Sequence, residues 1–231
     1  MRTTLKILSA LLCYPSAAVQ QAAPGLAAAL AADGVLSAAQ RAALQPLIDW
    51  LATADLLDLE EAYVALFDRG RAVSLYLFEH VHGEIRDRGQ AMVDLRARYE
   101  AQGLEIAANE LPDYLPLFLE YLSLLPADRA RAELAEPGLI LGALAKRLSE
   151  RGTPWAPPLA VLADLAGCDG DIALPAGEPE DPDDLAALDA AWEDVEVRFD
   201  TPVPADAACP QAAAMVARFQ SPEPARSSSH G

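Results

Sequence analysis

Apolar residues at helical spacing, in groups bounded by helix-capping residues, dominate the first 168 residues of this 231-residue chain. Ser37 and Gln40 have the spacing of a capping box, in which side chain and backbone satisfy each other at a helix start. The apolar residues that follow lie on one side of a helix: Leu44, Leu47, Ile48 and Leu51. Period-2 alternation rich in Val, Ile and Thr, which would indicate strands, is missing. The sequence therefore predicts an all-α fold, a single helical bundle.

Other capping and stop signals divide the rest of the bundle into short helices. Asp55 is placed to cap one helix, Gly103 and Gly152 to end two others, and Pro112 to begin one that Pro126 ends. Helices are expected over residues 37–51, 56–68, 86–102, 112–125, 138–151 and 154–167.

The N-terminal segment has a short apolar run after Lys6 and can be interpreted in two ways. A secretory signal peptide has such a run, but Leu5, Leu8, Leu11 and Leu12 recur at helical spacing, which favours an amphipathic core helix. No apolar run approaches the roughly 18 residues of a membrane span. We therefore expect a cytoplasmic protein with no direct membrane insertion.

The composition changes at residue 169 and divides the chain into two regions. Residues 1–168 form the predicted helical domain, whereas residues 169–231 hold 8 of the 18 prolines together with 14 acids and only 3 bases. Such a segment cannot bury enough apolar area to fold alone, so we expect a disordered acidic tail. Trp192 and Phe199 lie in it as a short docking element, either for the body of this chain or for a partner.

The net charge of −18 restricts the kind of partner. A field of that sign repels nucleic acid and anionic lipid and attracts a basic partner. The acidity also serves to keep an apolar-rich protein soluble.

The sequence gives little support for a catalytic or metal-binding site. The three cysteines form no CxxC pair and are best explained by a reducing compartment. His80 and His82 are two residues apart, which places them about 200° apart on a helix and disfavours a shared metal ion. The nearby Glu79, Glu84 and Asp87 have Arg71, Arg86 and Arg88 as salt-bridge partners. With no phosphate-binding loop or GxSxG elbow either, a binding protein is favoured over an enzyme.

A binding surface is predicted on the helix over 112–125. Asp113 and Glu120 are seven residues apart and therefore nearly stacked, and Tyr114 and Tyr121 repeat that spacing on the adjoining face. Carboxylates beside tyrosines suit a basic amphipathic helix. The alternative is that both tyrosines belong to the core and both acids face solvent.

Two contiguous words in the sequence have an unusual composition. They are LFEHVHGEIRDRGQAMVDL (Leu77 to Leu95) and ELPDYLPLFLEYL (Glu110 to Leu122), and the word EEAYVALF (Glu60 to Phe67) precedes them. With these words the chain resembles the NarJ-type assembly chaperones of respiratory nitrate reductase, within the TorD-like redox-enzyme maturation proteins. Ile85 departs from the family pattern, in which a small polar residue is common at that place.

The resemblance implies a TorD/NarJ-like helical domain that catalyses no reaction. Such a chaperone, expected to be a monomer, binds the N-terminus of the apo catalytic (alpha) subunit of nitrate reductase. It permits insertion of bis-molybdopterin guanine dinucleotide and of an iron–sulfur cluster before membrane attachment, and it binds no cofactor stably itself. The peptide-binding residues would be Tyr63, Phe67, Phe78, Glu79, His80, His82, Arg86, Asp87, Arg88, Asp113, Tyr114, Glu120 and Tyr121.

Three other functions stay open at this point. A chaperone of a dimethyl sulfoxide or trimethylamine oxide reductase would have the same fold. A small metal-dependent hydrolase would use Glu79, His80 and His82. A structural subunit would remain in the mature enzyme.

Overall fold

The computed structural model describes residues 1–68, 71–81, 85–106 and 110–168, and these form an all-α bundle. No strand occurs within those ranges, where the only β-type pairing is one isolated antiparallel bridge between Tyr76 and Tyr114. The α-helices are α1 (Arg2–Leu12), α2 (Ala17–Asp33), α3 (Ala38–Thr53), α4 (Leu56–Tyr63), α5 (Ile85–Ala101), α6 (Leu115–Leu122), α7 (Ala127–Leu134), α8 (Gly138–Glu150) and α9 (Ala156–Ala166). None of the described helices is long and apolar enough to cross a membrane.

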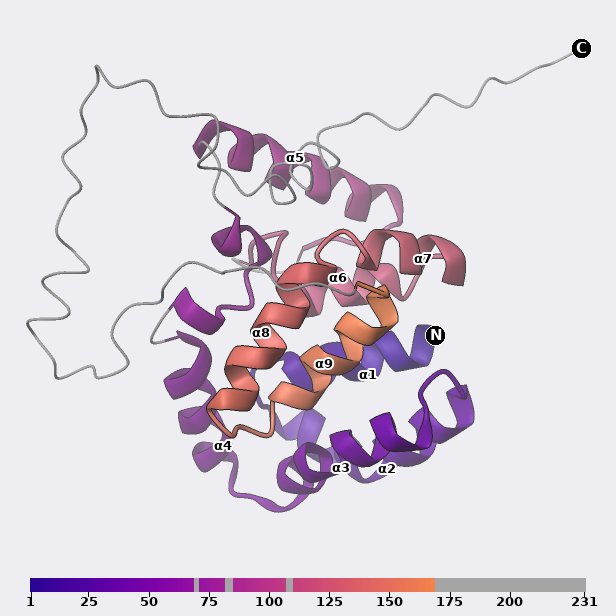
Figure 1. Cartoon of the computed structure of the whole chain (residues 1–231), viewed down its shortest axis with the longest axis vertical. Coiled ribbons are helices and arrows are strands. Elements are labelled where there is room, and N and C mark those ends of the chain that lie inside the picture. The colour runs from indigo at the N-terminus through magenta and orange to yellow at the C-terminus, as the bar shows by residue number, and fades with distance from the viewer. Residues whose placement is uncertain (69–70, 82–84, 107–109, 169–231) are drawn as a thin grey trace, which may run out of the picture.

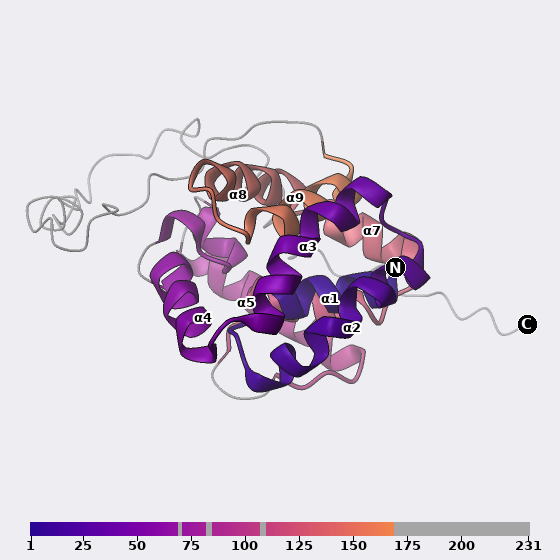
Figure 2. The ribbon, with the colours of Figure 1, turned by 90° about the horizontal axis from the view of Figure 1, so that it is seen from below.

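Helix α1 lies at the centre of the bundle. Its residues Leu5, Leu8 and Leu12 are fully buried, as the helical spacing predicted. Helices α2, α6 and α9 pack on it, α8 lies alongside α9, and α3 pairs with α2 (Figures 1 and 2). Helix α5 lies at the edge of the bundle, above α6 and α7 in Figure 1.

The predicted helix ends are mostly confirmed. Ser37 and Gln40 form the capping box of α3, and the Asp55 side chain accepts a hydrogen bond from the Leu57 N–H at the start of α4. Gly103 follows α5 with a φ of 77°, a left-handed conformation that glycine adopts without a steric penalty. Local capping chemistry is therefore enough to locate these helix ends.

Two predicted helices differ from the structure. The helix expected over 56–68 is α-helical only to Tyr63 and continues as a π-helical turn, Val64–Asp68. The helix expected from Pro112 begins at Leu115, so Asp113 and Tyr114 lie outside it. The physical reason is that the Asp113 carbonyl oxygen and the Leu115 N–H bond to Leu77 and Leu75, so neither group is available to extend the helix backwards.

The contact between α8 and α9 is tight at one end and looser further along. A Cβ atom on Gly138 would lie 2.9 Å from the Cβ of Cys168 and 3.0 Å from the Cβ of Ala166. A Cβ atom on Gly142 would lie 4.0 Å from the Cβ of Ala163, an ordinary van der Waals distance. Of these two glycines, only Gly138 lies too close to the C-terminal end of α9 and to Cys168 beyond it to admit a side chain.

Gly138→Ala is expected to lower the free energy of unfolding by about 1–3 kcal/mol, the usual effect of overpacking a close contact. Gly142→Ala is the matched control and should be neutral or stabilising by up to about 1 kcal/mol, because alanine favours the helix. Urea denaturation followed by circular dichroism measures both. Equal effects at the two positions would contradict the close approach of α8 and α9 at Gly138.

Candidate functional site

The start of the word Leu77 to Leu95 and the two residues before it meet the word Glu110 to Leu122 through their backbones. The Leu77 N–H donates to the Asp113 carbonyl oxygen at 3.0 Å, and the Leu115 N–H donates to the Leu75 carbonyl oxygen at 2.8 Å. The rings of Tyr76 and Tyr114 lie against each other with centroids 5.3 Å apart. This crossing, which we call the 75–77/113–115 pairing, joins segments almost 40 residues apart in sequence.

Asp113 belongs to the interior of this crossing. Its side chain is fully buried, and its Oδ2 accepts a hydrogen bond from the Phe78 N–H at 3.0 Å. Burial raises the pKa of Asp113 to about 6, against the opposing effects of the Phe78 hydrogen bond and the charge of Arg88. The predicted ridge on one helix, with Asp113 and Glu120 stacked, is therefore wrong, because Asp113 is buried outside α6 while Glu120 is exposed on it.

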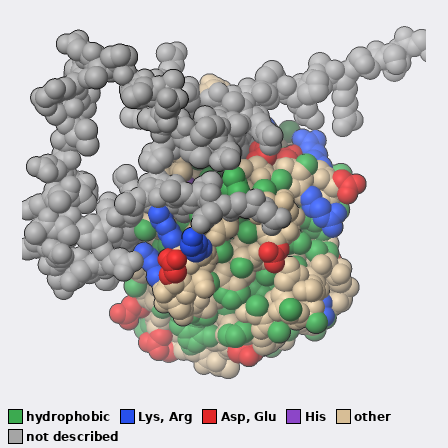
Figure 3. Space-filling model, in the orientation of Figure 1, with side chains coloured by type: hydrophobic (Ala, Val, Ile, Leu, Met, Phe, Trp, Pro, Cys, Tyr) green, Lys and Arg blue, Asp and Glu red, His purple; other side chains and the backbone are tan. Residues whose placement is uncertain are grey.

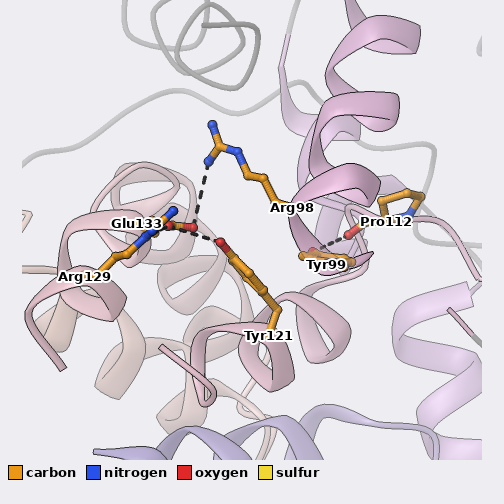
Figure 4. A network of polar contacts seen from close by, with 6 residues as sticks. All are labelled: Arg98, Tyr99, Pro112, Tyr121, Arg129 and Glu133. Atoms are coloured by element: carbon orange, nitrogen blue, oxygen red, sulfur yellow. Dashed lines mark hydrogen bonds and ion pairs between the residues drawn. The ribbon is translucent and has the colours of Figure 1, made fainter. Parts of the chain in front are cut away.

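Tyr121 also lies in the core. Figure 4 shows its hydroxyl beside Glu133 of α7, to which it donates a hydrogen bond at 3.2 Å. Arg129 donates to the same carboxylate at 2.9 Å, and Arg98 of α5 lies 3.9 Å from it. The neighbouring Tyr99 donates from its hydroxyl to the Pro112 carbonyl oxygen at 2.7 Å. The network joins α5, α6 and α7, so the tyrosine at 121 holds the fold together.

His80 is a buried structural residue. Its Nε2 lies 2.7 Å from the Ser74 carbonyl oxygen, so this nitrogen is the protonated donor. Burial lowers the pKa of His80 below its ordinary value, which favours the neutral ring. In the described part of the chain, no group of three His, Cys, Asp or Glu side chains could hold a metal ion.

The other predicted site residues divide by exposure. Tyr63, Phe67 and Phe78 are buried. Glu79, Arg88 and Tyr114 are half-buried. The side chains of His82, Arg86 and Asp87, and the tail residues Trp192 and Phe199, lie outside the described residues.

A row of tyrosines leads from the core to the surface. The Tyr63 hydroxyl donates to the Leu12 carbonyl oxygen at 2.9 Å and lies 3.0 Å from the Tyr114 hydroxyl. Tyr14, which is 47% exposed, packs edge-on against Tyr63 with ring centroids 5.5 Å apart. Tyr76 lies at the other end, against Tyr114. Tyr63 at the end of α4, Tyr14 after α1 and the 75–77/113–115 pairing supply these four rings from separate elements.

Carboxylates surround this row. The Tyr76 hydroxyl lies 3.4 Å from an oxygen of Glu110. Burial, with the charges of Glu110, Asp113 and Asp68, raises the pKa of Tyr76 to about 12. Burial and the charges of Glu60 and Asp68 raise the pKa of Tyr14. We call the accessible part of this region the tyrosine–carboxylate surface; it comprises Tyr14, Glu60, Asp68, Tyr76, Glu110 and Tyr114.

Sequence reasoning missed most of this surface. Of its members only Tyr114 was predicted as a site residue. Tyr14 follows α1 and Asp68 ends the π-helical turn, so neither belongs to a helical stripe that periodicity could detect. Glu110 opens the second unusual word, and its place in that word was the one available signal.

The fold and this surface define a class of protein. An all-α bundle whose accessible tyrosines and carboxylates gather beside a buried polar crossing is suited to binding another polypeptide. The chain belongs to the nitrate reductase delta subunit family, whose model matches residues 16–161.

Curated relatives agree with that membership. The chain is 46% identical over 198 residues, 84% of each chain, to the nitrate reductase molybdenum cofactor assembly chaperone NarJ of Escherichia coli K12. It is 49% identical over 152 residues to the probable nitrate reductase molybdenum cofactor assembly chaperone NarW of the same organism, covering 64% of this chain and 66% of NarW. It is 36% identical over 104 residues to the probable chaperone NarJ of Bacillus subtilis, covering 45% of this chain and 56% of that protein. The family recognised from the sequence is confirmed, and its members named as chaperones fit the prediction of a protein that is not an enzyme.

Asp113→Asn tests the burial of the carboxylate. The folded pKa of about 6 lies above the roughly 3.9 of an unfolded chain, so the native state binds this proton more tightly. The stability that this proton contributes is complete below about pH 4 and is lost as the pH rises through about 6. From pH 4 to 7, the unfolding free energy of the wild type should fall relative to that of the Asn variant by roughly 2 kcal/mol.

Urea titrations at each pH measure that difference. Asp58→Asn, which removes one negative charge at an exposed position of α4, is the control. Parallel pH profiles for wild type and Asp113→Asn would contradict a buried carboxylate.

Proposed function

We propose that this protein is a chaperone for the assembly of a respiratory nitrate reductase. In this proposal it binds the N-terminus of the catalytic subunit and keeps that subunit ready for its molybdenum cofactor before membrane attachment. Membership of the family, and relatives that are named as molybdenum cofactor assembly chaperones, support it. The chaperone acts in the cytoplasm as a monomer and leaves the finished enzyme.

The observation that most supports this function is the sign of the charges on the tyrosine–carboxylate surface. The charges that act on Tyr14, Tyr76 and Tyr114 come from acidic side chains and neighbouring ionisable tyrosines or Cys13. Glu60, Asp68, Glu110 and Asp113 are the carboxylates among them. Such a surface favours a basic segment over an acidic one.

The tyrosines supply the apolar part of the recognition. Tyrosine buries a large area while losing few rotatable bonds, and its hydroxyl keeps a polar end in water. Leu111, next to Glu110 in sequence, adds an aliphatic side chain that is 46% exposed. An amphipathic helix with one basic and one apolar face meets both kinds of contact.

The cofactor belongs to the client in this proposal. The chaperone assists the insertion of bis-molybdopterin guanine dinucleotide by holding the catalytic subunit open to it. The chaperone itself binds no cofactor in its complex with the client.

The alternative clients and roles are less well supported. A dimethyl sulfoxide or trimethylamine oxide reductase is a less suitable client, because the closely similar relatives are named for nitrate reductase. The family description contains the word subunit, whereas relatives with 46% and 49% identity are named as assembly chaperones. A transient chaperone is therefore proposed over a permanent subunit.

Asp68→Asn combined with Glu110→Gln tests the binding surface. A synthetic peptide with the N-terminal sequence of the catalytic subunit should bind the wild type at micromolar concentration, about −8 kcal/mol. Removing the two carboxylates should weaken binding by on the order of 1–3 kcal/mol, because basic side chains of the peptide lose their charged partners. Isothermal titration calorimetry measures both affinities.

Asp128→Asn with Glu150→Gln makes the same change in net charge at exposed positions of α7 and α8 and is the matched control. Equal affinities in the two double variants, with circular dichroism unchanged, would remove the tyrosine–carboxylate surface from the binding site.

Deleting the gene tests the role as an assembly factor. Cells without the chaperone should still synthesise the nitrate reductase subunits, but the catalytic subunit should contain little molybdenum, as measured by elemental analysis of the purified enzyme. Tagged mature enzyme from wild-type cells should lack the chaperone in stoichiometric amount. Stoichiometric co-purification would instead identify a permanent subunit.

A further inference from the structure

Three cations lie near the C-terminal end of α8. Lys146, Arg147 and Arg151 fall within six consecutive residues at the end of this helix, which also include one acid, Glu150. Arg147 donates from its guanidinium to the Ala72 carbonyl oxygen at 2.7 Å, and burial together with the like charge of Arg151 lowers its pKa. We call these three residues the α8 basic cluster. Figure 3 shows that Lys and Arg side chains are gathered in separate groups on the viewed face and are not spread evenly over it.

Part of this arrangement has a local explanation. Cations at the end of a helix interact favourably with its dipole and its last carbonyl groups. That effect accounts for one or two cations in the last turn. It does not explain the hydrogen bond from Arg147 to the Ala72 carbonyl oxygen. The charge of Arg147 also lowers the pKa of His80, a few residues further along that segment. The cluster therefore forms a cationic surface shared by α8 and the chain around residue 72.

A segment of complementary charge occurs in the same chain. Residues 178–200 contain ten acids and one base, and among them are Trp192 and Phe199. The tyrosine–carboxylate surface has the same sign as this segment and repels it, whereas the α8 basic cluster has the opposite sign. We propose that residues 178–200 bind the α8 basic cluster of their own molecule.

The chain is long enough for this contact. Helix α9 ends at Ala166, and Cys168 lies against Gly138 at the opposite end of α8 from the cluster. Since α8 has 13 residues, the distance to be covered is about 20 Å. Residues 169–177 span up to about 30 Å when extended. Linkage in one chain also gives the segment a local concentration on the order of millimolar, above that of a separate acidic partner.

The consequence is a division of the surface by charge. The acidic segment covers the cationic surface and shields it from other anionic partners. The tyrosine–carboxylate surface stays accessible to a basic client segment.

Zero-length carbodiimide crosslinking of the full-length protein tests the contact. The chain has two lysines, Lys6 and Lys146, and the reagent joins a lysine amine only to a carboxylate that touches it. Peptide mass spectrometry should find Lys146 joined to acids of residues 178–200. Lys6, on α1, is the internal control and should give few such products. Sodium chloride at about 1 M, where the Debye length is about 3 Å, should suppress the Lys146 products.

Two outcomes would overturn the proposal. One is a tail that crosslinks equally to Lys6 and Lys146, which indicates unspecific contact. The other is crosslinking that joins isotopically light to heavy molecules in a mixed sample, which identifies a contact between copies of the chain.

Limited trypsin digestion gives an independent measurement, because Arg198 is the only tryptic site in residues 178–200. Lys146→Glu with Arg151→Glu should release the segment and speed cleavage after Arg198 on the order of fivefold, as expected if about four fifths of the tails are docked. Cleavage after Arg218 is the internal reference. Arg2→Glu with Lys6→Glu makes the same charge change at exposed positions of α1 and should leave the Arg198 rate unchanged. Equal rates in both double variants would refute docking at the α8 basic cluster.

Discussion

The antiparallel crossing of residues 75–77 with residues 113–115 is the interaction on which the rest of this structure depends. Two backbone hydrogen bonds, together with the Asp113 carboxylate on the Phe78 N–H, fix a non-helical segment inside an all-α bundle. Because an unpaired buried backbone group is costly, these partners determine where α6 can begin. The pairing also sets Tyr76 against Tyr114 and so starts the row of tyrosines that reaches the surface.

The polar residues in and next to the family sequence words have two different uses. Asp113, His80 and Tyr121 satisfy hydrogen bonds inside the bundle and hold its elements together. Asp68 and Glu110 lie where their carboxylates remain exposed beside tyrosine rings. In the proposed function, recognition of a basic client falls to residues at the ends of elements, supported by a buried polar framework. Such a division is physically reasonable, since a binding surface is more precise when rigid neighbours hold it.

Local signals predicted much of the fold. The capping box of Ser37 and Gln40, the Asp55 cap and the stop at Gly103 depend only on residues close in sequence, and the structure confirms them. The predicted ridge failed because helical spacing was assumed to continue through Asp113 and Tyr114. Their backbone partners lie about 38 residues away, and periodicity has no information about such partners. For the same reason Tyr14 and Asp68 escaped notice, since each becomes part of a surface only when other elements fold against it.

The sequence by itself determined the all-α class, several helix boundaries, the family and the negative sign of the chain's own net charge. These properties follow from residue type, short-range spacing and long contiguous words, all of which exist before folding. The tertiary structure alone decided which polar residues are buried and which remain available. Burial depends on long-range packing and on where each backbone group finds its hydrogen-bond partner, and neither is a property of a residue's own neighbours in the chain.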